Sequence, residues 1–496
     1  MVRSRYAPSP TGFMHIGNLR TALYEYLIAK KDGGVFALRI EDTDGERYVE
    51  GAEDVIYYVL QTTGLVFDEG PGVGGAYGPY VQSQRKASYM VYAKDLMELG
   101  KAYYCFCTKE RLDSLSDARG LKKYDRHCYR LGKEEIALNI ANGLPYVVRQ
   151  YIPEGKTAFR DEVYGEITIE NTEIEDQILV KSDGMPTYNF ANVVDDHDMA
   201  ITHVVRGSEY LTSTPKYKLL YEAFGWDVPL FVHLPLLLNS SGKKISKRHN
   251  DASVTDLLKM GFLPSAIVNY AALLGWSHGG TEEIFSLPEL VQAFDIKKIS
   301  KAPSVFDMKK FTWMNGEHIK RLPMETYFEM ALPILSKAVK TEGIDYAELA
   351  RITQSRVSFV HECGEMLDFI DDLPEYSIEL YTHKKMKTNP EVAHKSLKLV
   401  VEGFERLQGW NHEILSEQIG QSAEEHGLSK GQILWPIRTA TSGKPTTPCG
   451  AVEICLILGR DETIKRLNKG ISMLELQVNK CTLRANNTNK NKFFSA

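Results

Sequence analysis

Long apolar stretches are missing from this chain of 496 residues, and their absence narrows its class. Residues 1–8 contain no apolar core of the kind that a secretion signal carries, and no segment reaches the roughly 18 apolar residues of a membrane span. Cysteines are also scarce. There are seven, an odd number, which favours free thiols in a reducing compartment over a disulfide framework. We therefore expect a cytoplasmic protein with no membrane partner.

An excess of one charge sign is missing as well. The 59 Lys and Arg residues oppose 65 Asp and Glu residues, so the formal net charge is −6. This balance excludes a uniformly basic surface, but it leaves nucleic-acid binding open because phosphate contacts need only a local basic face. The length corresponds to about three domains at roughly 150 residues each, and no internal repeat is evident.

The first forty residues have the pattern of a βαβ unit. Residues 3–7 predict a short strand, and Pro8 and Pro10 then force a loop, because proline blocks both a helix and a sheet ladder. Apolar residues at helical spacing begin at Leu19, and residues 35–40 predict a buried strand. The first loop of such a unit faces the N-terminus of its helix, where a ligand can meet backbone N–H groups.

Changes in periodicity along the chain predict its domains. We expect a Rossmann-type α/β domain that is interrupted by an inserted α+β domain and followed by an all-α region. Strand candidates return at residues 201–205 and 230–238, and helical patterns with caps such as Ser253 dominate from about residue 251. The expected boundaries are 1–100 and 186–240 for the two halves of the first domain, 101–185 for the insert, 241–325 for a first helical domain, 326–478 for a second one, and 479–496 for a polar tail that we expect to be disordered.

Two short motifs flank the first predicted domain. The segment HIGN at 15–18 lies between the proline loop and the helix, where a histidine can meet phosphate charge and a glycine lets the backbone approach a nucleotide. The segment KKISKR at 243–248 suits a polyphosphate, since lysine supplies a movable point charge. Taken singly, each has a plainer interpretation: a helix cap with an incidental histidine, and a solvated basic run.

In this order, the two motifs resemble the signatures of a class I aminoacyl-tRNA synthetase. HIGN is similar to the HIGH signature, and KISKR at 244–248 is similar to the KMSKS loop. Two departures are Asn18, in place of the second signature histidine, and Arg248, in place of the final serine. Further strings narrow the resemblance to bacterial-type glutamyl-tRNA synthetases: RYAPSPTG at 5–12, RIEDTD at 39–44, KSDGMPTY at 181–188, NVVDDH at 192–197 and RGSE at 206–209.

The resemblance implies an ATP-dependent ligase that joins L-glutamate to the 3′ end of tRNA(Glu) through a glutamyl-adenylate. The carboxylate of the substrate is the nucleophile, so the site needs positioning and charge stabilisation, and no Ser/His/Asp triad is required or apparent. Mg²⁺ would accompany ATP. The implied catalytic residues are His15, Lys247 and, more weakly, Lys244; the implied ATP-binding residues are His15, Gly17, Asn18, Glu209 and Lys247.

An acidic substrate needs a cation in its pocket, and an arginine fork holds a carboxylate at two points. The resemblance implies glutamate binding by Arg5, Ala7, Ser9, Glu41, Tyr188, Asn192 and Arg206, with Glu41 on the substrate's ammonium group. Any one of these charged residues could instead belong to a structural ion pair.

A third motif combines Cys105, Cys107, Tyr124 and Cys128. Two thiols two positions apart with a distant second pair have the logic of a four-coordinate structural zinc site. The resemblance favours a set of three cysteines and Tyr124, while His127 is a rival from the same loop. Free thiols beside a buried tyrosine are the plainer alternative. By contrast, GPGVGG at 70–75 fits a dinucleotide fingerprint only formally, because no helix can start cleanly after it.

The resemblance also assigns the domains and the partners. The insert would bind the acceptor stem, and residues 326–478 would read the anticodon. Residues 241–325 would carry a stem contact and the segment KKISKR at 243–248, called the basic loop below. Basic residues between Lys384 and Lys398, and the segment LWPIR at 434–438, are candidates for tRNA contact. A monomer is expected.

Four alternatives stay open beside this interpretation. The enzyme could also charge tRNA(Gln), or it could be a glutamyl-queuosine tRNA synthetase, a glutaminyl-tRNA synthetase or a non-catalytic tRNA-binding relative. About 170 helical residues after position 325 oppose the glutamyl-queuosine relative, which lacks that region. Glutaminyl-tRNA synthetases have a different proline loop and a β-rich C-terminal half, so this chain is unlike them. Retention of His15, Lys247, Arg5 and Glu41 opposes a non-catalytic protein.

Overall fold

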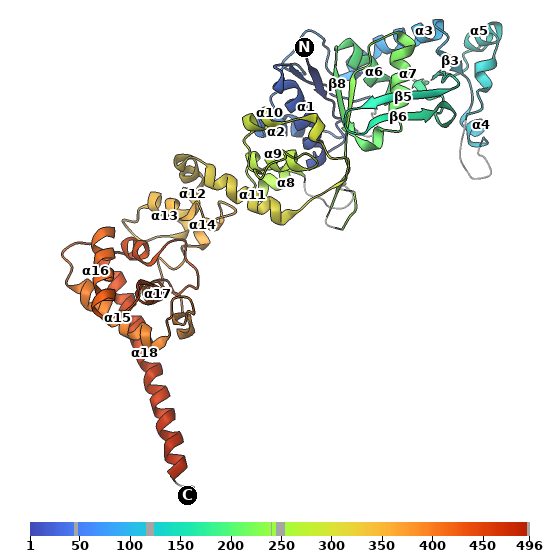
Figure 1. Cartoon of the computed structure of the whole chain (residues 1–496). Coiled ribbons are helices and arrows are strands. Elements are labelled where there is room, and N and C mark those ends of the chain that lie inside the picture. Colours follow the sequence, from blue (N-terminus) through green and yellow to red (C-terminus); the bar gives the residue numbers. More distant parts are fainter. Residues whose placement is uncertain (44–47, 116–123, 240, 245–252, 494–496) are drawn as a thin grey trace. The chain divides into compact units, whose positions relative to one another are not determined.

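The computed structural model describes residues 1–43, 48–115, 124–239, 241–244 and 253–493, with the backbone only beyond residue 476. The chain divides into two compact units, Met1–Met314 and Asn315–Ala496 (Figure 1). Within the described ranges, no helix is both long and apolar enough to span a bilayer.

A parallel sheet forms the centre of the first unit (Figure 1). Its elements and their flanking helices are β1 (Arg3–Tyr6), α1 (Ile16–Lys31), β2 (Val35–Leu38), α2 (Ala52–Thr62), α3 (Lys86–Glu98), α6 (Tyr188–Asp198), β8 (His203–Gly207), α7 (Thr214–Phe224) and β9 (Leu230–Leu234). Strand β1 pairs with β2, and β8 pairs with β9, both in parallel. The N–H of Thr202 donates to the carbonyl of Arg3 at 2.9 Å, which sets β8 beside β1. The predicted βαβ unit is confirmed.

The insert contains two different sheets. Its elements are β3 (Ala102–Cys105), α4 (Lys109–Asp113), α5 (Lys133–Ala141), β4 (Val147–Gln150), β5 (Lys156–Asp161), β6 (Gly165–Glu170) and β7 (Ile178–Val180). Strands β3, β4 and β7 form an antiparallel sheet of their own. The hairpin β5–β6 instead extends the sheet of β8 and β9, because Asp161 of β5 pairs in parallel with Phe231 of β9.

Residues 230–238, predicted as one strand, form two. Strand β9 ends at Leu234, and β10 (Leu237–Leu238) pairs with β11 (Ser304–Val305) in a separate small sheet. The expectation of one strand is wrong because Pro235 has no N–H to donate to a ladder. The break directs the chain toward residues 241–244, where the basic loop begins.

Helices dominate the remainder, as the sequence predicts. The rest of the first unit contains α8 (Val254–Lys259), α9 (Pro264–Leu273) and α10 (Leu287–Ala293), and α11 (Met308–Arg321) crosses the boundary between the units. Ser253 caps α8 in a reciprocal capping box with Asp256, so this predicted cap is confirmed.

The second unit is all-α. Its helices are α12 (Met324–Ala338), α13 (Tyr346–Thr353), α14 (Glu362–Glu365), α15 (Pro390–Glu405), α16 (His412–Glu425), α17 (Lys430–Ser442) and α18 (Ala451–Phe493). Leu397, Phe404 and Ile437 belong to its core. The tail that was expected to be disordered continues α18 as far as Phe493, since no Gly or Pro follows Gly470 to break the helix.

Candidate functional site

A cavity of about 590 Å³ lies where β1 and β8 end and α1 begins. It is lined by most of the residues that the sequence predicts for the site: Arg5, Ala7, Ser9, His15, Gly17, Asn18, Tyr188, Arg206, Glu209 and Lys244. Glu41 and Asn192 are buried and contact residues of the charge network around this cavity instead of lining it. Lys247 lies outside the described residues. The structure therefore brings together residues as far apart in the chain as Arg5 and Lys244.

His15 is the N-cap of helix α1. Its Nδ1 accepts hydrogen bonds from the backbone N–H groups of Gly17, at 3.0 Å, and Asn18, at 3.3 Å. A neutral imidazole whose Nδ1 accepts carries its hydrogen on Nε2. Gly17 is needed for this arrangement, because a Cβ there would lie 2.9 Å from Cε1 of His15. The helix end thus holds the histidine in one orientation at the wall of the cavity.

Arg206 presents unused hydrogen-bond donors at the buried end of the cavity. Its Nη2 donates to Oδ1 of Asn192 at 2.6 Å, while Nε and Nη1 have no partner among the described residues. The guanidinium lies over the ring of Tyr217 at 4.5 Å. Burial opposes its charge, but nearby Tyr188, Tyr217 and Asp196 outweigh that effect and raise the pKa of Arg206. A buried cation with two spare donors fits an incoming carboxylate.

Arg5, by contrast, is fully engaged by the protein. Its Nη1 donates to Oε1 of Glu25 at 2.8 Å and its Nε to Oδ1 of Asp196 at 2.8 Å. Asp196 also accepts from Arg39 at 2.8 Å and lies 3.9 Å from Arg206. Burial would raise the pKa of Asp196, but the three arginines around it lower the pKa overall. Asp196 is therefore the common counter-charge of the pocket.

Three members of this network were not assigned a role from the sequence: Glu25, Arg39 and Asp196. Arg39 and Asp196 do lie in strings that carry the family resemblance, but nothing local distinguishes them from ordinary surface charges. Glu25 lies among the apolar residues of α1 and is fully buried. Its position in an apolar stripe is the one signal in the sequence, because a carboxylate at such a position needs a partner.

Glu41 offers an unused acceptor. Its Oε1 accepts from Nη2 of Arg39 at 2.9 Å, while Oε2 is buried with no partner in the described part of the chain. Burial raises the pKa of Glu41, and Arg39 opposes this shift. One spare carboxylate oxygen fits an ammonium group.

The basic loop reaches the cavity through Lys244. Its Nζ lies 3.0 Å from Oε1 of Glu209, and both side chains are partly exposed. Lys244 lowers the pKa of Glu209, although burial acts in the opposite direction. The pair places a cation at the cavity, which residues 235–237 also line.

The predicted metal ligands lie together in the insert. The Sγ atoms of Cys105, Cys107 and Cys128 are within 4.8 Å of one another, and the hydroxyl of Tyr124 lies 3.4 Å from Sγ of Cys105. His127, the rival ligand, is exposed and is not part of this cluster. Hydrogen bonds from Cys128, and then Tyr124 and Arg149, lower the pKa of Cys105 to about 4. Three thiols around one point, one of them favouring the thiolate, fit Zn²⁺.

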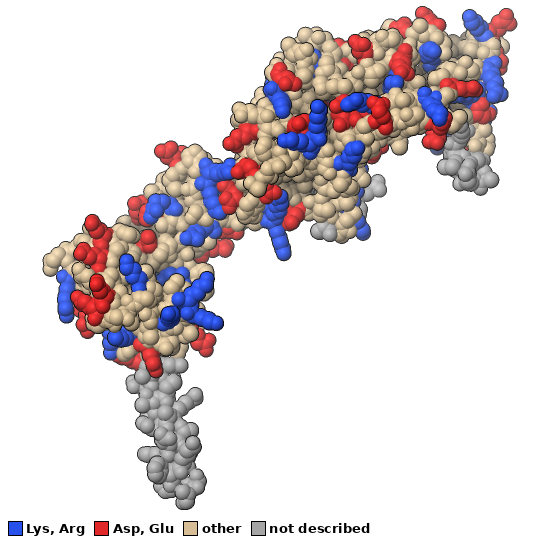
Figure 2. All heavy atoms as spheres, viewed as in Figure 1, with Lys and Arg blue, Asp and Glu red and all other residues tan. Residues whose placement is uncertain are grey.

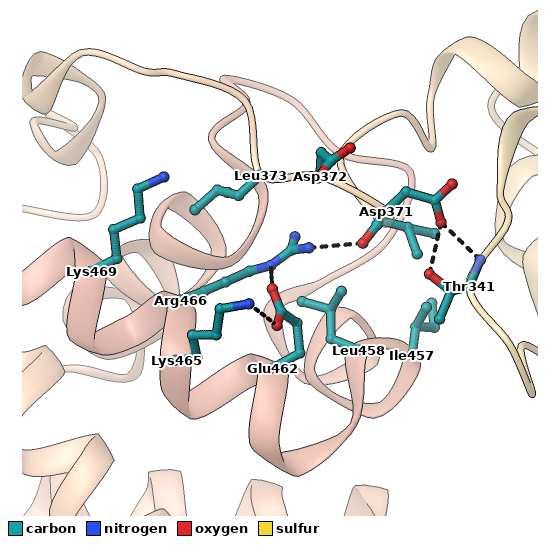
Figure 3. Close-up of a pocket in the computed structure, with 11 residues that line it drawn as sticks. Thr341, Asp371, Asp372, Leu373, Ile457, Leu458, Glu462, Lys465, Arg466 and Lys469 are labelled. Atoms are coloured by element: carbon teal, nitrogen blue, oxygen red, sulfur yellow. Dashed lines mark hydrogen bonds and ion pairs between the residues drawn. The ribbon is translucent and has the colours of Figure 1, made fainter.

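A second cavity, of about 420 Å³, lies in the second unit (Figure 3). Its central cation is Arg466, which donates to the carbonyls of Phe369, Ile370 and Thr441 and to Oε1 of Glu462. No nitrogen of Arg466 is left without a partner. Asp371, at the edge of the cavity, accepts from the N–H and hydroxyl of Thr341. The protein itself supplies the partners of Arg466 and of Glu462, which also pairs with Lys465.

The predicted segment LWPIR lies on α17, where Trp435 contacts both Arg438 and His383. The Arg438 guanidinium is 4.0 Å from the Trp435 ring centroid, and the imidazole of His383 is 3.9 Å from it on the adjacent loop. Nε of Arg438 is buried and has no partner among the residues described. Basic and acidic side chains are interspersed over the face of the molecule that Figure 2 shows.

Comparisons with known proteins agree with this geometry. Residues 1–313 match the family of class I tRNA synthetases (E and Q), catalytic domain, and residues 326–471 match the anticodon binding domain. A glutamate–tRNA ligase of Clostridium kluyveri is 53% identical over 481 residues, which is 96% of this chain and 99% of that protein. One from Clostridium botulinum strain Hall is 56% identical over 479 residues, with the same coverage of both chains. A crystal structure of the glutamate tRNA ligase of Elizabethkingia meningosepticum, in complex with its amino acid, has 36% identity and a TM-score of 0.83, and the match covers 95% of this chain and 99% of that one.

Proposed function

The chain belongs to the class I aminoacyl-tRNA synthetases and, within them, to the glutamate–tRNA ligases; on that premise we propose how its cavity activates L-glutamate with ATP and transfers it to tRNA(Glu). The observation that carries the proposal is the buried Arg206, whose Nε and Nη1 have no protein partner described and whose neighbours in the cavity include His15. An acidic amino acid supplies the carboxylate that these donors lack, beside the helix end that suits phosphate.

Glutamate binds at the buried end of the cavity. Arg206 holds the side-chain carboxylate, and Asn192 orients Arg206 through the bond at 2.6 Å. Glu41 accepts from the ammonium group through its spare Oε2. Arg5 contributes its positive charge while Glu25 and Asp196 hold it in place. Ala7, Ser9 and Tyr188 shape the remaining wall.

ATP binds at the opposite side, at the start of α1. The α-carboxylate oxygen of glutamate attacks the α-phosphorus, a new P–O bond forms, and the bond to the β-phosphate oxygen breaks to release pyrophosphate. His15, through Nε2–H, together with Lys244 and Lys247, stabilises the negative charge that develops on the phosphates, while Gly17 and Asn18 allow close approach of the helix end. Glu209 holds Lys244 ready at the rim. Mg²⁺ arrives with ATP, bound mostly by the phosphates.

The remaining regions bind tRNA. We assign residues 101–185 to the acceptor stem, 241–325 to the basic loop and stem, and 326–478 to the anticodon. The cluster of His383, Trp435 and Arg438 supports the last assignment, because aromatic side chains and arginine are the groups on which unpaired bases stack. Since charging must supply ribosomes, we place the enzyme in the cytoplasm, and we expect a monomer.

A structural zinc ion fits the cluster of Cys105, Cys107, Tyr124 and Cys128. These residues would hold the ion, and its role would be to cross-link β3 to the loop at 124–128, without taking part in the reaction. Metal analysis of protein purified without chelator is expected to give about one zinc per chain, and Cys107→Ser should lower it. Absence of zinc from the wild-type protein would contradict this assignment.

Two variants of the function differ in the tRNA used. A match of residues 326–471 to an anticodon-binding domain argues against a glutamyl-queuosine tRNA synthetase. The remaining choice, tRNA(Glu) alone or also tRNA(Gln), depends on the anticodon contacts. We propose tRNA(Glu) as the principal substrate.

The test is aminoacylation of purified tRNA(Glu) and tRNA(Gln) side by side, with glutamate-dependent pyrophosphate exchange measured with and without tRNA. We expect charging of tRNA(Glu) and exchange that requires glutamate. Charging of neither tRNA would contradict the proposal, while charging of both would identify an enzyme that does not discriminate. Charging should also weaken steeply as salt rises, despite the acidic net charge.

A further inference from the structure

Arg20 is a buried cation of the catalytic cavity for which the proposed mechanism has no role. It lies on α1, five residues after His15, and lines the same cavity with 4% of its surface exposed. Its Nη1 donates to the carbonyl of Leu274 at 2.9 Å and its Nη2 to the carbonyl of Pro235 at 2.6 Å. Its Nε is buried and has no partner among the described residues.

Among the described residues, Arg20 has no carboxylate partner, unlike several other buried arginines of the first unit. Arg3, Arg5, Arg39 and Arg85 are also buried, and each forms an ion pair with Asp or Glu at 2.9 Å or less. Arg20 forms none within the residues that the structure describes. Its two acceptors are carbonyl dipoles, which cannot cancel a full charge, and burial lowers the pKa of Arg20. The protein therefore keeps a buried positive charge beside the cavity that no described carboxylate pairs with directly, and Glu209 opposes it only at longer range.

The carbonyls of Pro235 and Leu274, which accept from Arg20, lie at the ends of two elements of the fold. Pro235 separates β9 from β10, the strand that leads into the basic loop at Lys244, and Leu274 is the C-cap of α9. Gly275 allows this close packing, since it has φ of +105° and a Cβ there would lie 3.0 Å from Pro235 and 3.4 Å from Nη1 of Arg20. One guanidinium thus joins α1, the base of the basic loop and the end of α9.

We propose that Arg20 is a positioning residue of ATP activation, which fixes the base of the basic loop against α1 and contributes a buried positive charge to the part of the cavity that takes the triphosphate. This rests on the proposed function, because it takes the ATP side of the cavity to be the start of α1. The ligand that would neutralise the charge of Arg20 is a polyphosphate anion, which carries several negative oxygens. Lys cannot replace Arg fully, because one ammonium group cannot reach two carbonyls in a fixed fork.

The experiment compares Arg20→Gln and Arg20→Lys with the wild type in glutamate-dependent pyrophosphate exchange with tRNA present. For Arg20→Gln we expect kcat/KM for ATP to fall about tenfold or more and pyrophosphate inhibition to weaken in parallel, with the KM for glutamate within about twofold. For Arg20→Lys, which keeps the charge, we expect a lower kcat with the KM for ATP within about threefold. Arg3→Gln is the matched control, because Arg3 is buried and pairs with Glu69 outside the cavity; it should lower the melting temperature and leave the KM for ATP unchanged.

Other outcomes overturn the inference. Wild-type ATP kinetics in both Arg20 variants would do so, and so would equal losses toward ATP and glutamate that follow the melting temperature. If Arg20→Gln does not fold, Arg20→Lys decides alone, and an unchanged kcat in it contradicts the positioning role. An inactive wild-type enzyme would instead refute the proposed function, so the two failures are distinguishable.

Discussion

The cavities of the two units are each lined by a buried arginine, but these arginines differ in their partners. In the first unit, Arg206 leaves Nε and Nη1 unused and Glu41 leaves Oε2 unused. In the second unit, Arg466 uses its nitrogens on three backbone carbonyls and Glu462. Figure 3 shows its contact with Glu462. An unmet buried hydrogen bond costs free energy unless a ligand completes it. The difference between the two cavities therefore lies in their hydrogen-bond donors. Arg206 offers unused donors to a ligand, and Arg466 offers none.

The strongest test of this comparison removes the spare donors. Arg206→Ala should reduce kcat/KM for glutamate by about 10²–10³-fold, because the substrate carboxylate loses its buried partner. Pyrophosphate exchange at varied glutamate concentration measures the effect. Arg206→Lys is the matched variant, and it should recover only part of the activity. Wild-type kinetics with glutamate in both variants would refute the pocket.

The complementary test removes the saturated arginine. Arg466→Met should lower the free energy of unfolding by about 3–5 kcal/mol, since three carbonyls lose a donor and Glu462 loses one of its two cationic partners. Denaturant unfolding measures this, and the KM values for ATP and glutamate should stay as in the wild type. If Arg466→Met changed the KM for glutamate without changing stability, the contrast between the cavities would fail.

Two glycines extend the comparison to the helix backbones. Gly17→Ala should reduce kcat about tenfold or more, because a Cβ would displace His15 from its present orientation. Gly420, within α16 of the second unit, has nothing within 4 Å of an added Cβ. Gly420→Ala should leave kcat unchanged and stabilise the protein by up to about 1 kcal/mol. Equal kinetics in the two variants would contradict the role given to Gly17.

The smallest expected effect concerns pH. Burial raises the pKa of Glu25 to about 8 from its ordinary value of 4.5, although Arg5 opposes this shift. Between these values the unfolded chain has released a proton that the folded chain keeps, so the contribution of Glu25 to stability falls as pH rises. Urea unfolding of the wild type and Glu25→Gln should therefore show a stability difference that shifts in favour of the variant from about pH 5 to about pH 8.

Glu462 supplies the opposite sign for comparison. Although burial acts to raise it, its ion pairs with Lys465 and Arg466 lower the pKa of Glu462 below 4.5 overall. Its stabilisation is therefore present above the ordinary pKa and is lost as pH falls through the folded value. Glu462→Gln should therefore be less stable than the wild type at neutral pH and equally stable only in acid. The same pH dependence of stability in Glu462→Gln and Glu25→Gln would contradict the contrast.

Much of the site is evident from sequence because its residues occur in short contiguous motifs. His15, Gly17 and Asn18 follow one another at a helix start, and a helix end exposes N–H groups wherever it occurs. The three cysteines and Tyr124 were likewise predictable as a group from spacing and family resemblance. The succession of an α/β region and an all-α region followed from periodicity, and the structure has the same succession.

What the chain alone determined is therefore local: which residues cap a helix, break a strand or alternate along it, and which short motifs resemble those of the family. The tertiary structure decided the rest, since Arg5 meets Asp196 across 191 positions and Arg20 meets Pro235 across 215. It also decided that the β5–β6 hairpin extends the sheet of β8 and β9 and that Arg206 keeps spare donors. The physical reason is that burial and pairing of charges depend on which distant segments the fold brings together, and no local pattern records that.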